Sequence, residues 1–412
     1  MAGKNRKDSK GRVLQTGEYQ RACDGVYLYR YKDFSSKWHS IYAGDLVELR
    51  LKEKELQKDQ LDGLNVYAAG NATLNLSFDR YMSTKYNLRP TTRANYTYMY
   101  DKFVRDEFGK RIIADIKYSD VKHFYYSLLN EKGLQINTLD TIHTILHPTF
   151  GMAVRDDVIR KNPTDSVMAE IKRSGWKNKG IRHALTLEQQ QAFMRAILMF
   201  PEYAHWFPLF TVLLGTGCRV GEVIGLRWSD VDMKKHLISI NHSVSYYPRE
   251  GSRKSMYAVS LPKTEAGVRI IPIMDQVYDV LANEYERQKT EGFCVFELDG
   301  MSGFIFSNRN GNLHNPHCIN QAINRISDAY NSKEIIDAKR EHREPVIIPH
   351  FSCHHLRHTF CSRLCENENN IKVIQEIMGH ANVETTLDIY AEVNYSKKQE
   401  ALEGLSNKIT LY

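Results

Sequence analysis

The chain has 412 residues, of which 42% are hydrophobic and 25% are charged, and its formal net charge is +7. These values are ordinary for folded globular protein and exclude a largely disordered chain, while the length favours about two or three domains. No run of about 18 apolar residues is present, and residues 1–12 are charged where a secretory signal would be apolar, so we expect a cytoplasmic protein. The seven scattered cysteines are expected to remain reduced thiols.

Basic residues are concentrated near the N-terminus. Residues 1–37 hold nine Lys/Arg and four Asp/Glu, an excess that supplies five of the net positive charges. A polyanionic partner and a merely solvated basic tail explain this excess equally well.

The first segment, residues 1–70, is predicted to be a small α+β module. Residues 25–31 and 37–43 are rich in aromatic and β-favouring side chains and are separated by a polar stretch, which is typical of a β-hairpin. Asp45 then caps a predicted helix with one apolar face. Such a sheet can lie in a DNA groove, although a small module of another purpose has the same pattern. The residues expected on the apolar face are Leu46, Leu49 and Leu56.

The second segment, residues 74–170, is predicted to be helical. Helical periodicity begins near Thr91, Ser119 and Thr138, and the third run passes Pro148 before the break at Asn162-Pro163. The apolar stripe of these runs is rich in aromatic residues, and we interpret it as core rather than as a platform for stacking bases. Its members are Tyr96, Met99, Tyr100, Phe103, Val104, Val121, Phe124, Tyr125, Leu128, Leu129, Ile142, Ile145 and Leu146.

A basic stretch without periodicity, residues 171–184, is predicted to link two domains. Its five Lys/Arg can follow a phosphate backbone or serve solubility alone. Thr186 and Gln189 then form a T-x-x-Q capping box, which opens the last and largest segment, residues 185–412.

The first of three motifs in this last segment is TGCRVGEVIGLRWSDVD, residues 216–232. Glu222 follows Arg219 by three positions, so on a helix its carboxylate can reach back and hold the guanidinium. Alone, this pair would be an ordinary salt bridge. The second motif, LPKTEAGVRIIPI at residues 261–273, predicts a strand, a turn built on Gly267 and a second strand, with Lys263 on the resulting hairpin.

The third motif has two parts, HHLRHTF at residues 354–360 and MGHANVETTLDIY at residues 378–390. A lone H-x-x-R or a lone Tyr carries no weight among 16 histidines and 24 tyrosines. Six matched positions in a fixed order, inside TG-x-R-x-x-E, PKT, LRHTF and MGH contexts, are far more specific. These positions are Arg219, Lys263, His354, Arg357, His380 and Tyr390.

This ordered set resembles the signature of the tyrosine recombinases, the phage integrase family. The resemblance implies a multidomain α+β fold, with a small β-sheet module that binds arm-type DNA, a helical core-binding domain, and a mainly α catalytic domain that contains a small antiparallel sheet. It also implies that Tyr390 attacks a DNA phosphate without a metal or nucleotide cofactor. The three-part plan is most similar to integrases of conjugative transposons, which implies core-type and arm-type DNA sites, a homotetramer on DNA and an accessory excision protein.

The chemistry explains why these residue types are needed. Two guanidiniums, those of Arg219 and Arg357, suit the charge that develops on phosphate oxygens. A phenol with a pKa near 10 needs a proton acceptor, for which His354 is the candidate. We expect His380 to donate a hydrogen bond to a nonbridging oxygen and Lys263 to protonate the leaving 5′ oxygen.

Several alternatives accompany this interpretation. Tyr395 and Tyr412 offer rival hydroxyls, since the spacing from His380 to Tyr390 is one residue longer than in many family members. A topoisomerase of type IB shares this chemistry, and a regulator that only binds DNA could keep the scaffold. Residues 396–409 form a possible helix that docks either on a neighbouring protomer or on its own domain. A zinc site is disfavoured because a C-x-x-C pair is missing among Cys353, Cys361, Cys365, His354, His355 and His358.

Overall fold

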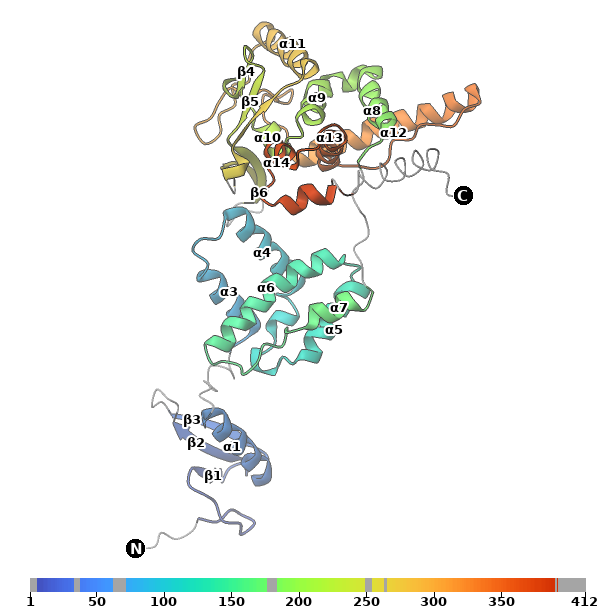
Figure 1. Cartoon of the computed structure of the whole chain (residues 1–412). Coiled ribbons are helices and arrows are strands. Elements are labelled where there is room, and N and C mark those ends of the chain that lie inside the picture. The colour runs from blue at the N-terminus through green and yellow to red at the C-terminus, as the bar shows by residue number, and fades with distance from the viewer. Residues whose placement is uncertain are drawn as a thin grey trace, which may run out of the picture. The chain divides into compact units, whose positions relative to one another are not determined.

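The computed structural model describes residues 6–32, 38–61, 72–175, 184–248, 254–262, 265–389 and 391. The chain divides into two compact units, residues 1–180 and 181–412 (Figure 1). The first contains an N-terminal α+β module and a group of helices, and the second combines helices with small antiparallel sheets. This arrangement confirms the predicted fold class.

The N-terminal module consists of a three-stranded antiparallel sheet and one helix. The strands β1 (Glu18–Gln20), β2 (Tyr27–Lys32) and β3 (Trp38–Ala43) lie in the order β1-β2-β3, and α1 (Leu46–Leu61) follows. The two predicted strands are confirmed, whereas the three-residue β1 gave no periodic signal. The predicted apolar face of α1 is also confirmed, because Leu46, Leu49 and Leu56 are buried.

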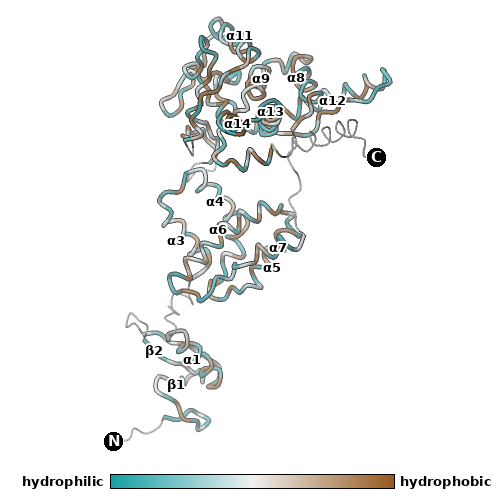
Figure 2. Tube along the Cα trace, in the orientation of Figure 1, coloured by the Kyte–Doolittle hydropathy of each residue, from teal (hydrophilic) through white to brown (hydrophobic). Residues whose placement is uncertain are grey.

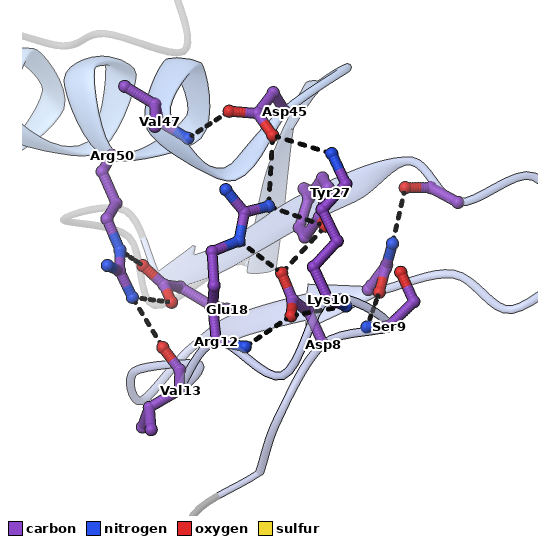
Figure 3. A network of polar contacts seen from close by, with 12 residues as sticks. Asp8, Ser9, Lys10, Arg12, Val13, Glu18, Tyr27, Asp45, Val47 and Arg50 are labelled. Atoms are coloured by element: carbon purple, nitrogen blue, oxygen red, sulfur yellow. Dashed lines mark hydrogen bonds and ion pairs between the residues drawn. The ribbon is translucent and has the colours of Figure 1, made fainter.

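A polar network holds the chain before β1 against this sheet (Figure 3). The Nε of Arg12 donates to Oδ2 of Asp8 at 2.8 Å, and its Nη2 donates to the Tyr27 hydroxyl and to Oδ1 of Asp45 at 3.0 and 3.1 Å. Although burial opposes ionisation of Asp8, the hydrogen bonds that it accepts from Arg12 and from the Tyr27 hydroxyl hold its pKa down to about 2. Arg50 donates from Nε and Nη2 to the buried Glu18 at 2.8 and 3.1 Å, which ties α1 to the sheet.

The helical part of the first unit buries the stripe predicted from the sequence. Met99, Tyr100, Tyr125 and Leu146 are all buried, which supports their interpretation as core. Both hydrophobic and hydrophilic residues lie along α6 (Ile136–Arg155), a helix that includes Pro148 (Figure 2). The helices are α3 (Leu74–Ser83), α4 (Pro90–Phe103), α5 (Tyr118–Asn130), α6 (Ile136–Arg155) and α7 (Val167–Arg173), with short 3-10 turns η1 (Phe108–Lys110) and η2 (Ile113–Asp115).

Two details differ from the sequence analysis. α3 was not predicted, and α7 continues to Arg173, so it includes the first residues of the stretch interpreted as a linker. Val167 and Ile171 are buried in the helical core, which explains why the helix extends that far. Residues 176–183 lie outside the described part of the chain.

The second unit begins with α8 (Leu187–Met199), whose predicted capping box is present: Thr186 and Gln189 exchange backbone-to-side-chain bonds, both at 3.1 Å. η3 (Pro201–Trp206) and the apolar α9 (Phe207–Thr216) follow, and then α10 (Val220–Ile224). The other helices are η4 (Trp228–Asp230), η5 (Glu265–Gly267), α11 (Asp275–Glu291), α12 (Pro316–Glu341), α13 (Cys353–Asn367) and α14 (Ile371–Met378), and residues 383–389 are also helical.

Two small sheets complete this unit. β4 (Val231–Asp232), β5 (Leu237–Ile240) and β8 (Arg269–Pro272) form one sheet beside α11 (Figure 1), and β6 (Ser243–Pro248) pairs with β7 (Ser255–Ser260). One continuous core of buried aliphatic and aromatic side chains joins these elements to α8, α9, α12 and α13.

The strands β7 and β8 pair with other strands and not with each other, which corrects one prediction. Among the described residues β7 pairs with β6 and β8 pairs with β5, so the hairpin expected around Lys263 is wrong. β8 joins β5 because Ile271 and Ile238, opposite each other in the register, are both buried in the core. Lys263 itself lies outside the described residues.

In the described part of the chain, no single helix has both the length and the apolar character needed to cross a membrane. The pair Leu187–Met199 and Pro201–Thr216 reaches that threshold only jointly, across a bend of 115°.

Candidate active site

Arg219 stands at the start of α10, directly after the turn that ends α9. Gly217 ends α9 with φ of +62°, a left-handed conformation that favours glycine. Glu222 accepts from the backbone N–H of Arg219 and from its Nη1, both at 2.8 Å, so its carboxylate fixes the guanidinium as the three-residue spacing predicts. The side chain of Arg219 remains 44% exposed and can therefore reach a ligand.

Arg357 lies on α13 and is buried. Its Nη1 donates to the carbonyl of Gly217 at 2.7 Å, and its Nη2 donates to the carbonyl of Met378 at 2.5 Å. Burial, reinforced by the neighbouring cation of Arg219, lowers the pKa of Arg357 to about 10. The guanidinium therefore remains charged at neutral pH and adds its positive charge to that of the neighbouring Arg219.

His380 follows α14, which ends at Gly379 with φ of +62°. Its Nδ1 lies 2.9 Å from the hydroxyl of the buried Thr386. Burial, together with the cations of Arg357 and Arg219, lowers the pKa of His380 to about 4. The ring is neutral at pH 7, and when Thr386 donates to Nδ1, the proton resides on Nε2 and can be donated to a ligand.

His354 lies one turn before Arg357 on α13 and is exposed. Its ring meets that of His358 edge-on, with centroids 5.0 Å apart, and His358 in turn contributes to the low pKa of His380. His355 caps α13, because its Nδ1 accepts from the backbone N–H of Ser352 at 3.1 Å. The structure thus gives His355 a structural role at the start of α13.

Lys263 and Tyr390 lie outside the described residues, as do the rival hydroxyls of Tyr395 and Tyr412 and the predicted tail helix at 396–409. Their described neighbours are well packed. Pro262 is in close contact with Gly267, where an added Cβ would come within 2.5 Å of the proline Cβ. Ile389, next to Tyr390, is buried in a cluster with Cys361, Cys365, Ile374 and Met378.

Arg269, a buried arginine on β8, was not predicted as a site residue. Its Nη2 and Nη1 donate to the two carboxylate oxygens of Glu222 at 2.8 and 3.2 Å, and its Nε donates to the carbonyl of Ile377 at 2.9 Å. A signal was available: side chains alternate along a strand, so Arg269 faces the same side of β8 as the buried, apolar Ile271.

Guanidiniums outnumber carboxylates in this cluster. Arg219 and Arg269 bond to the carboxylate of Glu222, and Arg357 lies near it, so these four described side chains carry an excess of positive charge beside His380. Such a cluster suits an anion with several oxygens, for example a phosphodiester. In the described ranges, no three His, Cys, Asp or Glu side chains are grouped so that they could hold a metal ion.

Comparison with protein families agrees with this geometry. The phage integrase family matches residues 183–397, which is more than half of the chain. The DNA binding domain of tn916 integrase matches residues 2–60, and the N-terminal SAM-like domain of phage integrases matches residues 73–129.

Curated relatives match along nearly their whole length. The chain is 30% identical to the transposase from transposon Tn1545 of Streptococcus agalactiae and to the transposase from transposon Tn916 of Enterococcus faecalis, over 98% of this chain and 97% of each relative. Among solved structures, it resembles the Tn1549 transposon integrase in complex with a circular intermediate DNA, with a TM-score of 0.68 and 27% identity over 80% of this chain and 99% of that one.

The same transposon integrase bound to transposon right end DNA gives a TM-score of 0.68 with 28% identity over 81% of this chain and all of that one. The expected resemblance is thereby confirmed by family, by relatives of full length and by fold. This chain belongs to the phage integrase family of tyrosine recombinases.

Proposed function

We propose that this protein is the integrase of a conjugative transposon, which cuts and rejoins DNA to integrate and excise the element. One observation carries the proposal: Arg219 and Arg357 donate to adjacent carbonyls, those of Gly379 and Met378, directly before His380. This puts two phosphate-binding side chains and one neutral hydrogen-bond donor at one place. The relatives named for transposons Tn1545 and Tn916 support the assignment to such an element.

In the proposed reaction the hydroxyl of Tyr390 attacks the scissile phosphorus, and His354 takes its proton. The bond from phosphorus to the 5′ oxygen breaks, and Lys263 gives a proton to that oxygen. The products are a 3′-phosphotyrosyl linkage and a free 5′-hydroxyl. Because the covalent linkage conserves the energy of the broken bond, a 5′-hydroxyl of another strand can reverse the step without ATP.

Arg219, Arg357 and His380 stabilise the charge that develops on the nonbridging oxygens. Two charged guanidiniums can each offer hydrogen bonds to these oxygens, and neutral His380 can offer Nε2–H. The low pKa of His380, about 4, supports donation by a neutral ring rather than by an imidazolium.

The N-terminal module is proposed to bind arm-type DNA through the sheet face opposite α1. Tyr19, Trp38 and Tyr42 are exposed on this face. Cations lie over their rings: Arg6 is 4.5 Å from the Tyr19 centroid, and Arg30 is 5.3 Å from that of Trp38. Aromatic and basic side chains on a twisted sheet are suited to a DNA groove, and the match to the DNA binding domain of tn916 integrase supports this role.

The helical domain at 74–170 and the catalytic domain at 185–412 are proposed to enclose the core-type site, joined by the basic stretch at 171–184. Exchange of both strands between two duplexes breaks four phosphodiesters, and one protomer supplies one Tyr390, so we propose a homotetramer on DNA. An accessory excision protein and a cytoplasmic site of action belong to the same proposal.

A nicked suicide substrate tests the proposal. Attachment-site DNA with a nick near the cleavage point releases a short fragment and so traps the covalent complex. Wild-type protein and Tyr395→Phe are expected to form the adduct, whereas Tyr390→Phe is expected to bind the DNA without forming it. An adduct with Tyr390→Phe would overturn the assignment of the nucleophile, and binding without any wild-type adduct would indicate a regulator. Relaxation of supercoiled DNA without exchange between two sites would indicate a topoisomerase.

A further inference from the structure

Arg269 is a charged side chain enclosed inside the catalytic unit. Only 5% of its side chain is exposed, compared with 44% for Arg219. It therefore faces the interior of the protein, where its partners are Glu222, the carbonyl of Ile377 and, at longer distances, the carbonyl of Gly267 and the sulfur of Cys218. Because all three guanidinium nitrogens of Arg269 donate to these protein groups, a role for this arginine acts through those partners rather than through contact with DNA.

The strongest of these partners is the carboxylate of Glu222, which Arg269 shares with Arg219. Oε1 accepts from Nη1 of Arg269 and Nη1 of Arg219, and Oε2 accepts from Nη2 of Arg269 and the backbone N–H of Arg219. Glu222 is buried, so water cannot replace a lost donor at low cost. Without Arg269 the carboxylate would lose two of its four donors and the orientation that they impose.

Arg269 also fixes the end of α14. The carbonyls of Ile377, Met378 and Gly379 each accept from a different arginine, namely Arg269, Arg357 and Arg219 in that order. Gly379 lies so close to Arg269 that an added Cβ would be 3.0 Å from its Cδ and Nη1. Because His380 follows Gly379 immediately, the contacts of Arg269 with the end of α14 help to set the position of the His380 side chain.

A buried ion pair usually adds little stability compared with well-packed apolar side chains. The buried pair of Arg269 and Glu222 is therefore better explained by a contribution to function than by one to stability. We propose that Arg269 is a positioning residue for strand cleavage: it holds Glu222, and through Glu222 the guanidinium of Arg219, in register with the end of α14 that presents His380. This role rests on the proposed function. The bidentate geometry requires the planar fork of arginine, which lysine lacks.

The test compares Arg269→Lys with wild type in single-turnover cleavage of the nicked substrate. DNA affinity is expected to stay within about 3-fold, because Arg269 is enclosed, while the cleavage rate falls about 100-fold, the usual cost of misplacing a catalytic group by about 1 Å. Arg269→Met, which also removes the charge, is expected to lose at least as much. Arg343→Lys is the matched control, because Arg343 also makes a bidentate pair with a buried carboxylate, that of Glu334 on α12. This variant is expected to cleave at the wild-type rate.

A second substrate separates positioning from simple loss of folded protein. A methylphosphonate at the scissile position removes one negative charge, and with it much of the need for a correctly placed Arg219. The ratio of wild-type to Arg269→Lys rates is therefore expected to shrink at least 10-fold on this substrate. A partly unfolded preparation would lower both rates alike and leave the ratio unchanged.

Three outcomes decide the matter. A smaller ratio on the methylphosphonate supports the proposed role. An equal ratio on both substrates, or a wild-type rate for Arg269→Lys, overturns the role of Arg269 and leaves the recombinase function intact. Absence of any wild-type adduct overturns the function and this role together.

Discussion

Replacement of Gly379 by alanine tests how closely the end of α14 must approach the arginine cluster. Gly379 and Gly133 have nearly the same backbone conformation, with φ of +62° and +63°. Their surroundings differ: a Cβ at Gly379 would lie 2.9 Å from the carbonyl oxygen of Ala266 and 3.0 Å from Arg269, whereas a Cβ at Gly133 would meet nothing within 4 Å. Gly133→Ala is therefore a control that isolates the contact from the backbone effect.

The expected magnitudes follow from these contacts. A left-handed conformation costs an alanine about 1 kcal/mol at either position. At Gly379 the neighbours must also shift, and such overpacking costs about 1–3 kcal/mol. Gly379→Ala should therefore lower the free energy of unfolding by about 2–4 kcal/mol, and Gly133→Ala by about 1 kcal/mol.

The effect on cleavage should separate the two variants further. The carbonyl of Gly379 accepts from Arg219, and a shift of α14 also moves His380, so Gly379→Ala is expected to slow single-turnover cleavage about 10- to 100-fold. Gly133→Ala should cleave at the wild-type rate. Urea unfolding and the nicked substrate measure the two quantities. Equal losses of stability and equal cleavage rates for the two variants would refute this account of the close approach.

Three further predictions concern other parts of the molecule. Thr386→Val removes the hydroxyl that holds Nδ1 of His380, so cleavage should slow roughly 10-fold with DNA affinity unchanged, as gel-shift and single-turnover assays would measure; an unchanged rate would contradict this role. The pKa of His380 is about 4 in the folded protein, below its usual value of 6.5, so the unfolded state binds the proton more tightly. The contribution of neutral His380 to the free energy of unfolding should therefore be complete above pH 6.5, and the free energy should fall by at most about 3 kcal/mol as the pH drops toward 4. Urea unfolding at several pH values checks this, and His380→Asn should reduce the slope. Asp8→Asn removes the negative charge and leaves one acceptor oxygen for the donors that two oxygens now satisfy, among them Arg12 and Tyr27. It should therefore weaken binding to arm-type DNA and leave cleavage of core-type DNA unchanged; an undiminished affinity for arm-type DNA would count against the network.

The fold class was predictable because local sequence patterns indicate most of the helices and strands. The leucines of α1 and the apolar residues of α4, α5 and α6 recur at helical spacing, and Thr186 with Gln189 marks the start of α8. The prediction of the fold failed where local sequence patterns do not determine which strands pair. The motif at residues 261–273 predicted the strand β8 correctly, but its expected first strand is not seen at 261–262 or 265–267, and β8 pairs with β5 through the core contact of Ile271 with Ile238.

The site was partly predictable for a related reason. Arg219 and Glu222 interact through local helical spacing, so three residues of sequence suffice to predict their contact. The contacts of Arg357 and Arg269 join residues 21 to 140 positions apart, and no local pattern specifies them. Lys263 and Tyr390 remain predictions.

The central claim is that Tyr390 becomes covalently joined to DNA. The most direct measurement is mass spectrometry of the trapped complex after nuclease and trypsin digestion, since one tryptic peptide spans residues 373–397 and contains both Tyr390 and Tyr395. Fragment ions should assign the added nucleotide mass to Tyr390. A nucleotide on Tyr395, on a residue outside this peptide, or on no residue of the wild-type protein would contradict the account.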